Sequence, residues 1–142
     1  EAAWTPDARF VVAGSLGNEA TEVDRIVGAI GADFSGPLDT YVNVQLIVDH
    51  VSSDRQLVRP RTDVISTLRI QKDFDDDLHA LRAEWLNSVT DSDGLVRLEL
   101  SRRIDDRFSI FLAGDIFYGS SSGIFGQYSE RSRILSGIRF TL

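Results

Sequence analysis

The sequence has no cysteine and no methionine among its 142 residues. Without cysteine there is no disulfide, no thiolate metal ligand and no cysteine nucleophile. No run of about 18 apolar residues occurs, so a transmembrane helix is excluded and a membrane location would require strands. Lysine is nearly absent too, since Lys72 is the only one among fifteen basic residues. The net charge of −7 argues against nucleic acid as a partner.

What the sequence does contain is alternation of apolar and polar residues, most clearly near its end. In Arg107–Tyr118, Phe108 and Ile110 fall on one face, and Ser109 and Asp115 fall on the other. The last ten residues repeat this pattern. Period-two alternation over about ten residues predicts a strand with one apolar and one polar face. Ten residues is also roughly the length that a tilted strand needs to cross a bilayer.

The same rhythm predicts eight strands in one all-β domain covering residues 1–142. The predicted strands run approximately over Arg9–Gly17, Asp24–Phe34, Leu38–Val51, Val64–Phe74, Leu78–Asn87, Leu95–Ile104, Arg107–Tyr118 and Arg133–Leu142. The fifth is ambiguous, because Leu78, Leu81 and Trp85 would also share one side of an amphipathic helix. As a strand, its parity is shifted by one from its neighbours, which a turn of different length or a bulge would explain.

The connections between these strands alternate in length. Those at Ser35–Pro37, Asp75–Asp77 and Asp105–Asp106 are short. Those around Asn18 and at Ser52–Asp63, Ser88–Gly94 and Gly119–Ser132 are longer. An even number of strands with this asymmetry predicts an eight-stranded antiparallel up-and-down transmembrane β-barrel, with short periplasmic turns and longer external loops.

The phenylalanines support a membrane setting. Five of them are expected on the apolar face near the rim with the short turns, where they would form an aromatic girdle at the membrane interface. These five are Phe10, Phe34, Phe74, Phe108 and Phe140.

The polar face carries charges of both signs, which are tolerable inside a barrel only when they are paired or wet. We predict an interior ionic network made of Arg69, Asp73, Arg82, Glu84, Arg97, Glu99, Asp115, Arg133 and Arg139. Within it, Arg69 is expected to pair with Glu84, and Glu99 either with Arg82 or with the neighbours of Asp115. The alternative is a soluble lipocalin-like barrel, which would turn the apolar face inward around an apolar ligand.

The end of the chain resembles the C-terminal insertion signal of bacterial outer-membrane β-barrel proteins, at Gly137, Phe140 and Leu142. That family usually ends on Phe, where this chain has Leu142. The longer stretch Gly94–Leu142 looks like the end of larger proteobacterial barrels. The resemblance implies an outer-membrane location, contact with outer-membrane lipid and assembly by the barrel-insertion machinery. It implies no specific activity, and it leaves open that the chain is a piece of a larger barrel.

Few residues point to catalysis. His50, beside Ser52 and Ser53, is the only plausible nucleophilic constellation, and we expect a solvated histidine rather than an enzyme. No metal site and no cofactor are predicted. The expected function is a structural or anchoring barrel, or a module that binds an unknown external ligand through loops such as Gly119–Ser132. The alternative in a membrane is a pore or transporter, whole or as part of a larger barrel.

Overall fold

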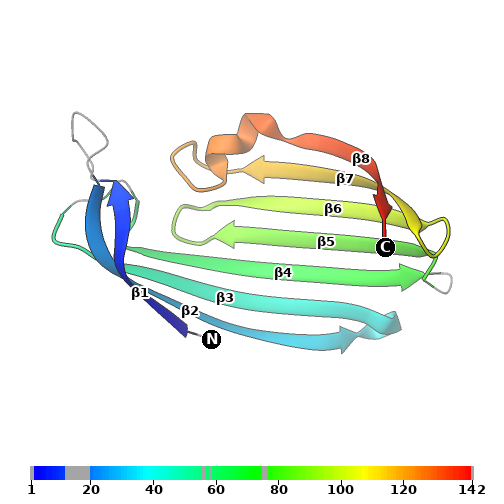
Figure 1. The fold of residues 1–142 in the computed structure, drawn as a ribbon, viewed down its shortest axis with the longest axis horizontal. Coiled ribbons are helices and arrows are strands. Elements are labelled where there is room, and N and C mark those ends of the chain that lie inside the picture. The colour runs from blue at the N-terminus through cyan, green and yellow to red at the C-terminus, as the bar shows by residue number, and fades with distance from the viewer. Residues whose placement is uncertain (1, 12–19, 56, 58, 75–76, 142) are drawn as a thin grey trace.

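The computed structural model describes residues 2–11, 20–55, 57, 59–74 and 77–141, and they form one antiparallel sheet (Figure 1). Eight strands follow one another in chain order, each paired with the next. They are β1 (Ala2–Val11), β2 (Ala20–Gly36), β3 (Thr40–Ser52), β4 (Thr62–Phe74), β5 (His79–Ser88), β6 (Asp93–Arg103), β7 (Phe108–Tyr118) and β8 (Arg133–Phe140). Two short 3₁₀ helices, η1 (Pro37–Asp39) and η2 (Gly126–Arg131), lie in connections. The all-β meander is therefore confirmed.

The predicted closure into a barrel is not found. In the part of the chain that the structure describes, β1 and β8 are the two edges of the sheet and do not pair with each other. Alternation along a strand reports which face is buried, but it is the same in an open sheet and in a closed one. Closure was therefore inferred from the even strand number, and that inference is wrong for the chain as it stands in this structure.

The fifth strand is a strand and not a helix, since β5 pairs with both β4 and β6 along its whole length. Its shifted parity comes from the connections beside it. Phe74 pairs with His79, and Ser88 pairs with Asp93. An even number of residues lies between the partners in both cases, so odd positions of β5 share a face with even positions of its neighbours.

The first strand begins earlier than predicted and contains a β-bulge. The register of β1 against β2 shifts between Thr5 and Ala8, where Pro6 lacks an N–H and Asp7 has a φ of 54°. The extra residue moves every later side chain of β1 to the other face. Trp4 pairs with Ile26 on the apolar face, whereas Phe10 pairs with Thr21 on the polar one. The predicted stretch 12–17 lies outside the described residues.

The connections lie at the two ends of the sheet as their lengths predict. Figure 1 shows β2–β3, β4–β5 and β6–β7 joined at the right and the longer loops at the left. We call these the short-turn end and the loop end. The loop around Asn18 and residues 75–76 are outside the described part of the chain.

The two faces of the sheet differ sharply in exposure. With one exception, the buried strand residues lie on the polar face, and they are Val23, Asp49, Val51, Asp63, Ser88, Asp93, Ala113 and Asp115. The exception is Gly94, which lies beneath Tyr118 on the apolar face. The apolar face is exposed, with Ile30 at 74% and Ile134 at 82%. The polar side of the sheet, which we call the inner face, is thus the more shielded one, and the apolar side, which we call the outer face, is the more exposed.

Candidate functional site

Eight of the nine residues predicted as an ionic network come together on the inner face, across β4 to β8. We call them the central cluster, and they are Arg69, Arg82, Glu84, Arg97, Glu99, Asp115, Arg133 and Arg139. The predicted pair Arg69–Glu84 is present, with 3.6 Å between Arg69 Nε and Glu84 Oε1. Of the two partners considered for Glu99, Arg82 is found, with Nη1 3.3 Å from Glu99 Oε1. Neighbouring strands place these residues at adjacent register positions, which parity alone had indicated.

Asp115 is the most enclosed member of the central cluster, with 0% of its side chain exposed. Arg97 donates to both of its oxygens, at 2.6 and 3.1 Å, and Arg133 Nε donates to Oδ2 at 2.9 Å. A carboxylate removed from water needs such charge-assisted hydrogen bonds to remain ionised without a large cost. The guanidinium groups come from β6 and β8, one on each side of Asp115 in β7.

Glu99 has the same arrangement. Arg139 binds it with two parallel hydrogen bonds of 2.8 and 2.6 Å, and Arg82 approaches from the other side. Arg139 reaches from β8 to β6 by lying over the ring of Phe111, with 4.4 Å from Cζ to the ring centroid. Phe111 in turn lies against Gly137, where a Cβ would stand 2.7 Å from a ring carbon. Phe111 is not among the site residues predicted from the sequence.

Among the described residues, a glutamine joins Asp73 to the central cluster. Gln71 donates to Asp73 Oδ2 at 3.3 Å and accepts a hydrogen bond of the same length from Arg82 Nε. Asp73 is the second-to-last residue of β4, and it lies nearer the short-turn end than the ion pairs do. Its predicted membership is thus indirect.

A second ionic group, which the sequence analysis did not find, lies near the loop end. Arg25 forms two 3.0 Å hydrogen bonds to Asp49, and Arg59 Nη1 donates to the same carboxylate at 2.8 Å. Arg25 and Asp49 share the inner face at neighbouring positions of β2 and β3, so their parity could have predicted this pair. Arg59 comes from a loop, and no periodic signal marks it.

Phe10 belongs with this loop-end group and not with the predicted aromatic girdle. It packs with the buried residues Val23, Val51 and Leu57, and Arg59 lies 5.3 Å from its ring centroid. The prediction that Phe10 lies on the apolar face at the short-turn rim is wrong on both counts. The bulge at Pro6–Asp7 reverses its face, and the early start of β1 puts it at the opposite end.

The other four predicted girdle residues lie on the outer face near the short-turn end of their strands. Phe34, Phe74, Phe108 and Phe140 are all exposed, and the rings of Phe108 and Phe140 are 5.0 Å apart. A further aromatic group, missed in the sequence, occupies the outer face toward the loop end. There the Trp85 indole N–H donates to the Tyr118 hydroxyl at 2.6 Å, and that hydroxyl donates to Asn87.

The loop Gly119–Ser132 folds back onto the rim of the sheet. Asp93 Oδ2 accepts hydrogen bonds from the backbone N–H groups of Phe125 and Gly126, at 2.6 and 2.8 Å. The ring of Tyr128 lies 5.7 Å from that of Phe117. Nearby, partial burial and the charges of Asp63 and Asp93 raise the pKa of Asp91 above its ordinary value.

His50 and Ser53, from the candidate nucleophilic constellation, make separate hydrogen bonds. The ring of His50 shares a 2.8 Å hydrogen bond with the Thr62 hydroxyl, while Ser53 bonds to the backbone of Arg55. The described residues contain no group of three or more His, Asp or Glu side chains able to hold a metal ion. No helix among them is long and apolar enough to cross a membrane.

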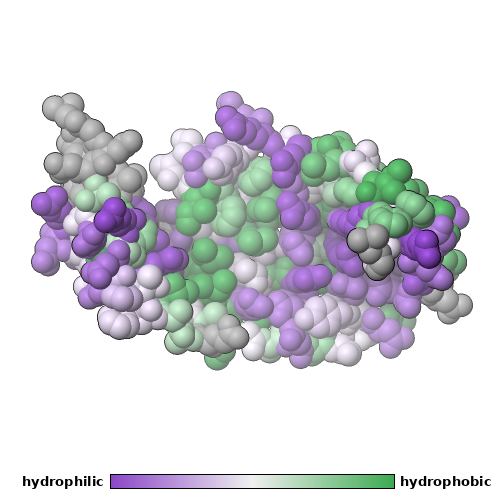
Figure 2. Space-filling view, viewed as in Figure 1, coloured by the Kyte–Doolittle hydropathy of each residue, from purple (hydrophilic) through white to green (hydrophobic). Residues whose placement is uncertain are grey.

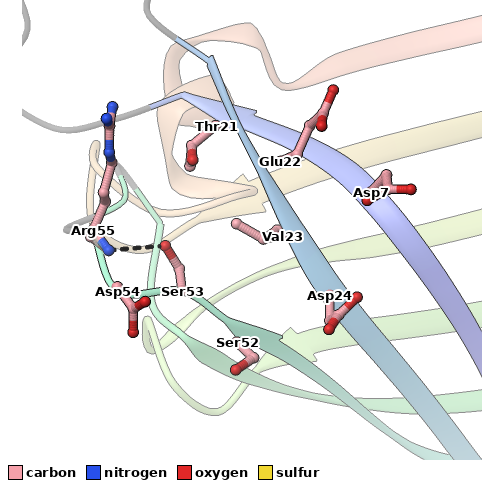
Figure 3. Close-up of a pocket in the computed structure, with 9 residues that line it drawn as sticks. All are labelled: Asp7, Thr21, Glu22, Val23, Asp24, Ser52, Ser53, Asp54 and Arg55. Atoms are coloured by element: carbon pink, nitrogen blue, oxygen red, sulfur yellow. Dashed lines mark hydrogen bonds between the residues drawn. The ribbon is translucent and has the colours of Figure 1, made fainter.

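An open polar hollow of about 450 Å³ lies between β1, β2 and the start of the β3–β4 loop (Figure 3). Its acidic residues are Asp7, Glu22, Asp24 and Asp54. Figure 3 shows their carboxylates pointing in different directions rather than toward one point. The hollow therefore lacks the convergence that a cation or catalytic site requires.

Leu142 of the predicted insertion signal lies outside the described residues, while Gly137 and Phe140 lie on opposite faces of β8. Gly137 has a structural reason of its own, the close approach of Phe111. In comparisons with known proteins, no family model matches the chain, and no curated protein or solved structure matches it either.

Proposed function

We propose that this chain forms a membrane-embedded β-sheet wall of a bacterial outer-membrane protein, with its outer face against lipid and its ionic inner face turned away from lipid. The observation that carries the proposal is the exposure of the outer face. Its exposed strand residues include Ile26, Ile30, Phe34, Val44, Leu46, Val48, Ile70, Phe74, Leu81, Trp85, Leu98, Leu100, Phe108, Ile110, Leu112, Ile116, Ile134, Ile138 and Phe140.

So large an apolar surface needs an apolar phase to cover it. Water-soluble monomers rarely expose contiguous apolar patches larger than a few hundred Å². Burying one Leu- or Phe-sized side chain contributes about 1.5–3 kcal/mol, so covering this face is strongly favourable. A lipocalin-like barrel would enclose this face instead, whereas the buried strand residues other than Gly94 are all on the opposite side.

The dimensions of the sheet fit a bilayer. The 11 residues of β6 span about 35 Å at roughly 3.3 Å per residue. A strand tilt of about 40° reduces this to about 27 Å along the membrane normal. The hydrocarbon core of a bilayer is about 30 Å thick. Aromatic residues toward both ends of the outer face, Phe74 and Phe108 at one and Trp85 and Tyr118 at the other, are typical of membrane interfaces.

Tryptophan quenching by brominated lipid tests the proposal. The chain is refolded into vesicles of brominated phosphatidylcholine as two single-tryptophan variants. Trp4→Phe leaves Trp85 on the outer face. The matched control, Trp4→Phe with Trp85→Phe and Leu86→Trp, moves the indole by one residue to the inner face. We expect strong quenching at position 85 and weak quenching at position 86. Equal quenching, or none, contradicts the proposal.

A second candidate, the wall of a pore or transporter, is favoured by the open edges. Unpaired backbone groups of an edge strand cost several kcal/mol each in hydrocarbon, so β1 and β8 need strand partners there. Further strands or another copy would supply them and widen the enclosed space beyond that of an eight-stranded barrel. Step currents in planar bilayers are expected in that case. An absence of step currents, together with a heat-modifiable monomer band on gels, would rule out the pore or transporter and leave only the first candidate.

A further inference from the structure

The charges of the central cluster are arranged in layers. Two of its three carboxylates lie low against the sheet, since the side chains of Asp115 and Glu99 are 0% and 12% exposed, while Glu84 is 32% exposed. The arginine side chains are more exposed, from 36% for Arg82 to 57% for Arg133. What the inner face presents to its surroundings over these strands is therefore mainly arginine. In Figure 2 hydrophilic side chains form a band across the middle of the sheet.

The central cluster also has an excess of positive charge. Asp115 and Glu99 are each held between two arginines, and Arg69 with Glu84 forms the remaining pair. Five arginines thus face three carboxylates, which leaves two positive charges without a counterpart in the cluster. This excess is local, because the chain as a whole carries −7.

The arginines keep unused hydrogen-bond donors. Each guanidinium has five N–H donors. Arg133 uses one of them in the hydrogen bonds of the described residues, and Arg82 and Arg139 use two each. Within the described part of the chain, the buried side-chain nitrogens and oxygens that have no partner are Arg59 Nη2 and Asp93 Oδ1, neither of which belongs to the cluster. The spare donors of the central cluster therefore reach the open space above the inner face.

We infer that the central cluster is a binding surface for small anions with carboxylate, phosphate or sulfonate groups. Spare, half-exposed guanidinium donors match the oxygens of such groups in pairs. Buried carboxylates below them hold the donors in place. Asp33 and Asp73 lie on the same face nearer the short-turn end, outside the cluster, and confine the attraction to the middle of the sheet. The inference rests on the proposed function for the route by which anions reach this face.

The test measures the binding of the trisulfonate dye pyranine by fluorescence anisotropy. The full chain is refolded in a non-ionic detergent at low salt. We expect saturable binding that inorganic phosphate displaces and that weakens as salt is raised. Arg133→Gln removes the most exposed guanidinium of the cluster while Asp115 keeps Arg97. At about 6 Å in water, one charge changes anion affinity by about threefold, and adding Arg139→Gln should bring the loss to about tenfold.

Two controls separate binding from folding. Arg133→Lys keeps the charge and should keep most of the affinity. Arg102→Gln makes the same charge change on the outer face and should leave affinity unaltered. All variants are compared by circular dichroism. No saturable binding, or an equal loss in Arg102→Gln and Arg133→Gln, would overturn the inference.

The outcome is independent of the lipid experiment. Pyranine is measured in micelles and reports on the inner face, whereas brominated lipid reports on the outer face. If Trp85 is not quenched by lipid but pyranine binds, the proposed function fails and the anion surface stands. If Trp85 is quenched and pyranine does not bind, the proposed function stands and the anion-binding surface is refuted.

Discussion

Replacing Asp115 by Asn is the sharpest test of how the inner face is held together. The substitution keeps the size and shape of the side chain and removes one charge. It leaves Arg97 and Arg133, which converge on the two oxygens of Asp115, with one acceptor and one amide N–H in place of two acceptors. The amide donor then faces a guanidinium donor, and the two arginines repel each other without the carboxylate between them.

The expected cost follows from the exposure of the three groups. Removing one member of a buried ion pair typically costs about 3–5 kcal/mol, because a charge is left buried and unpaired. Here the abandoned charges are the arginines, which are 41% and 57% exposed and can turn to water. We therefore expect a loss of about 2–3 kcal/mol in the free energy of unfolding, at the low end of that range or just below it.

The assay is urea unfolding of the refolded chain in detergent micelles, followed by tryptophan fluorescence. Asp106→Asn, in the exposed β6–β7 turn, makes the same chemical change away from any described ion pair and should stay within about 0.5 kcal/mol of the parent. A double-mutant cycle with Arg133→Gln should show coupling of at least about 0.5 kcal/mol. If Asp115→Asn is as stable as Asp106→Asn, the carboxylate does not organise the cluster.

Three further outcomes can be checked on the same preparation. Gly137→Ala should cost about 1–3 kcal/mol in urea unfolding, because its Cβ would press on the Phe111 ring; an unchanged midpoint would show that the ring moves freely. Asp93→Ala removes the acceptor for two backbone N–H groups of the β7–β8 loop and should speed tryptic cleavage there at Arg131, with circular dichroism unchanged; equal cleavage rates would mean that other contacts hold the loop. Asp91 has a raised pKa, so the folded chain binds its proton more tightly than the unfolded chain does, and stability falls as pH rises from about 3.8 through the folded pKa. Asp91→Asn should therefore be at least as stable as the parent at pH 7 and lose that advantage near pH 3. A variant that is less stable than the parent at pH 7 and more stable near pH 3 would refute the direction of this pKa shift.

Much of the sheet could be predicted from the sequence because period-two alternation is a direct consequence of strand geometry. The last seven strands lie within a few residues of their predicted bounds, and the pair Arg69–Glu84 follows from parity and neighbouring order alone. The alternation of faces predicts contacts between adjacent strands, but not between strands that are separated by a third. The contact of Arg139 with Glu99 skips β7 and depends on the ring of Phe111, which no local pattern marks.

The first strand shows why the remainder was missed. The first predicted strand starts at Arg9, after Pro6 and Asp7 interrupt the alternation. In the structure the interruption is a bulge inside a strand, with Trp4 on one side of it and Phe10 on the other. A one-residue insertion cannot be told from a strand boundary when only three or four residues precede it. The error reversed the face of Phe10 and moved it to the opposite end of the sheet.

The same bulge bears on closure. A sheet closes only if its edge strands meet in register, and the register of β1 is set by where its extra residue lies. Here β1 is divided into a segment paired with residues 25–28 of β2 and another paired with residues 20–23. β8, at the far edge, has eight residues and pairs only with β7 among the described strands. In this structure the two edges do not pair with each other, so the side of the sheet that carries the arginines of the central cluster remains open.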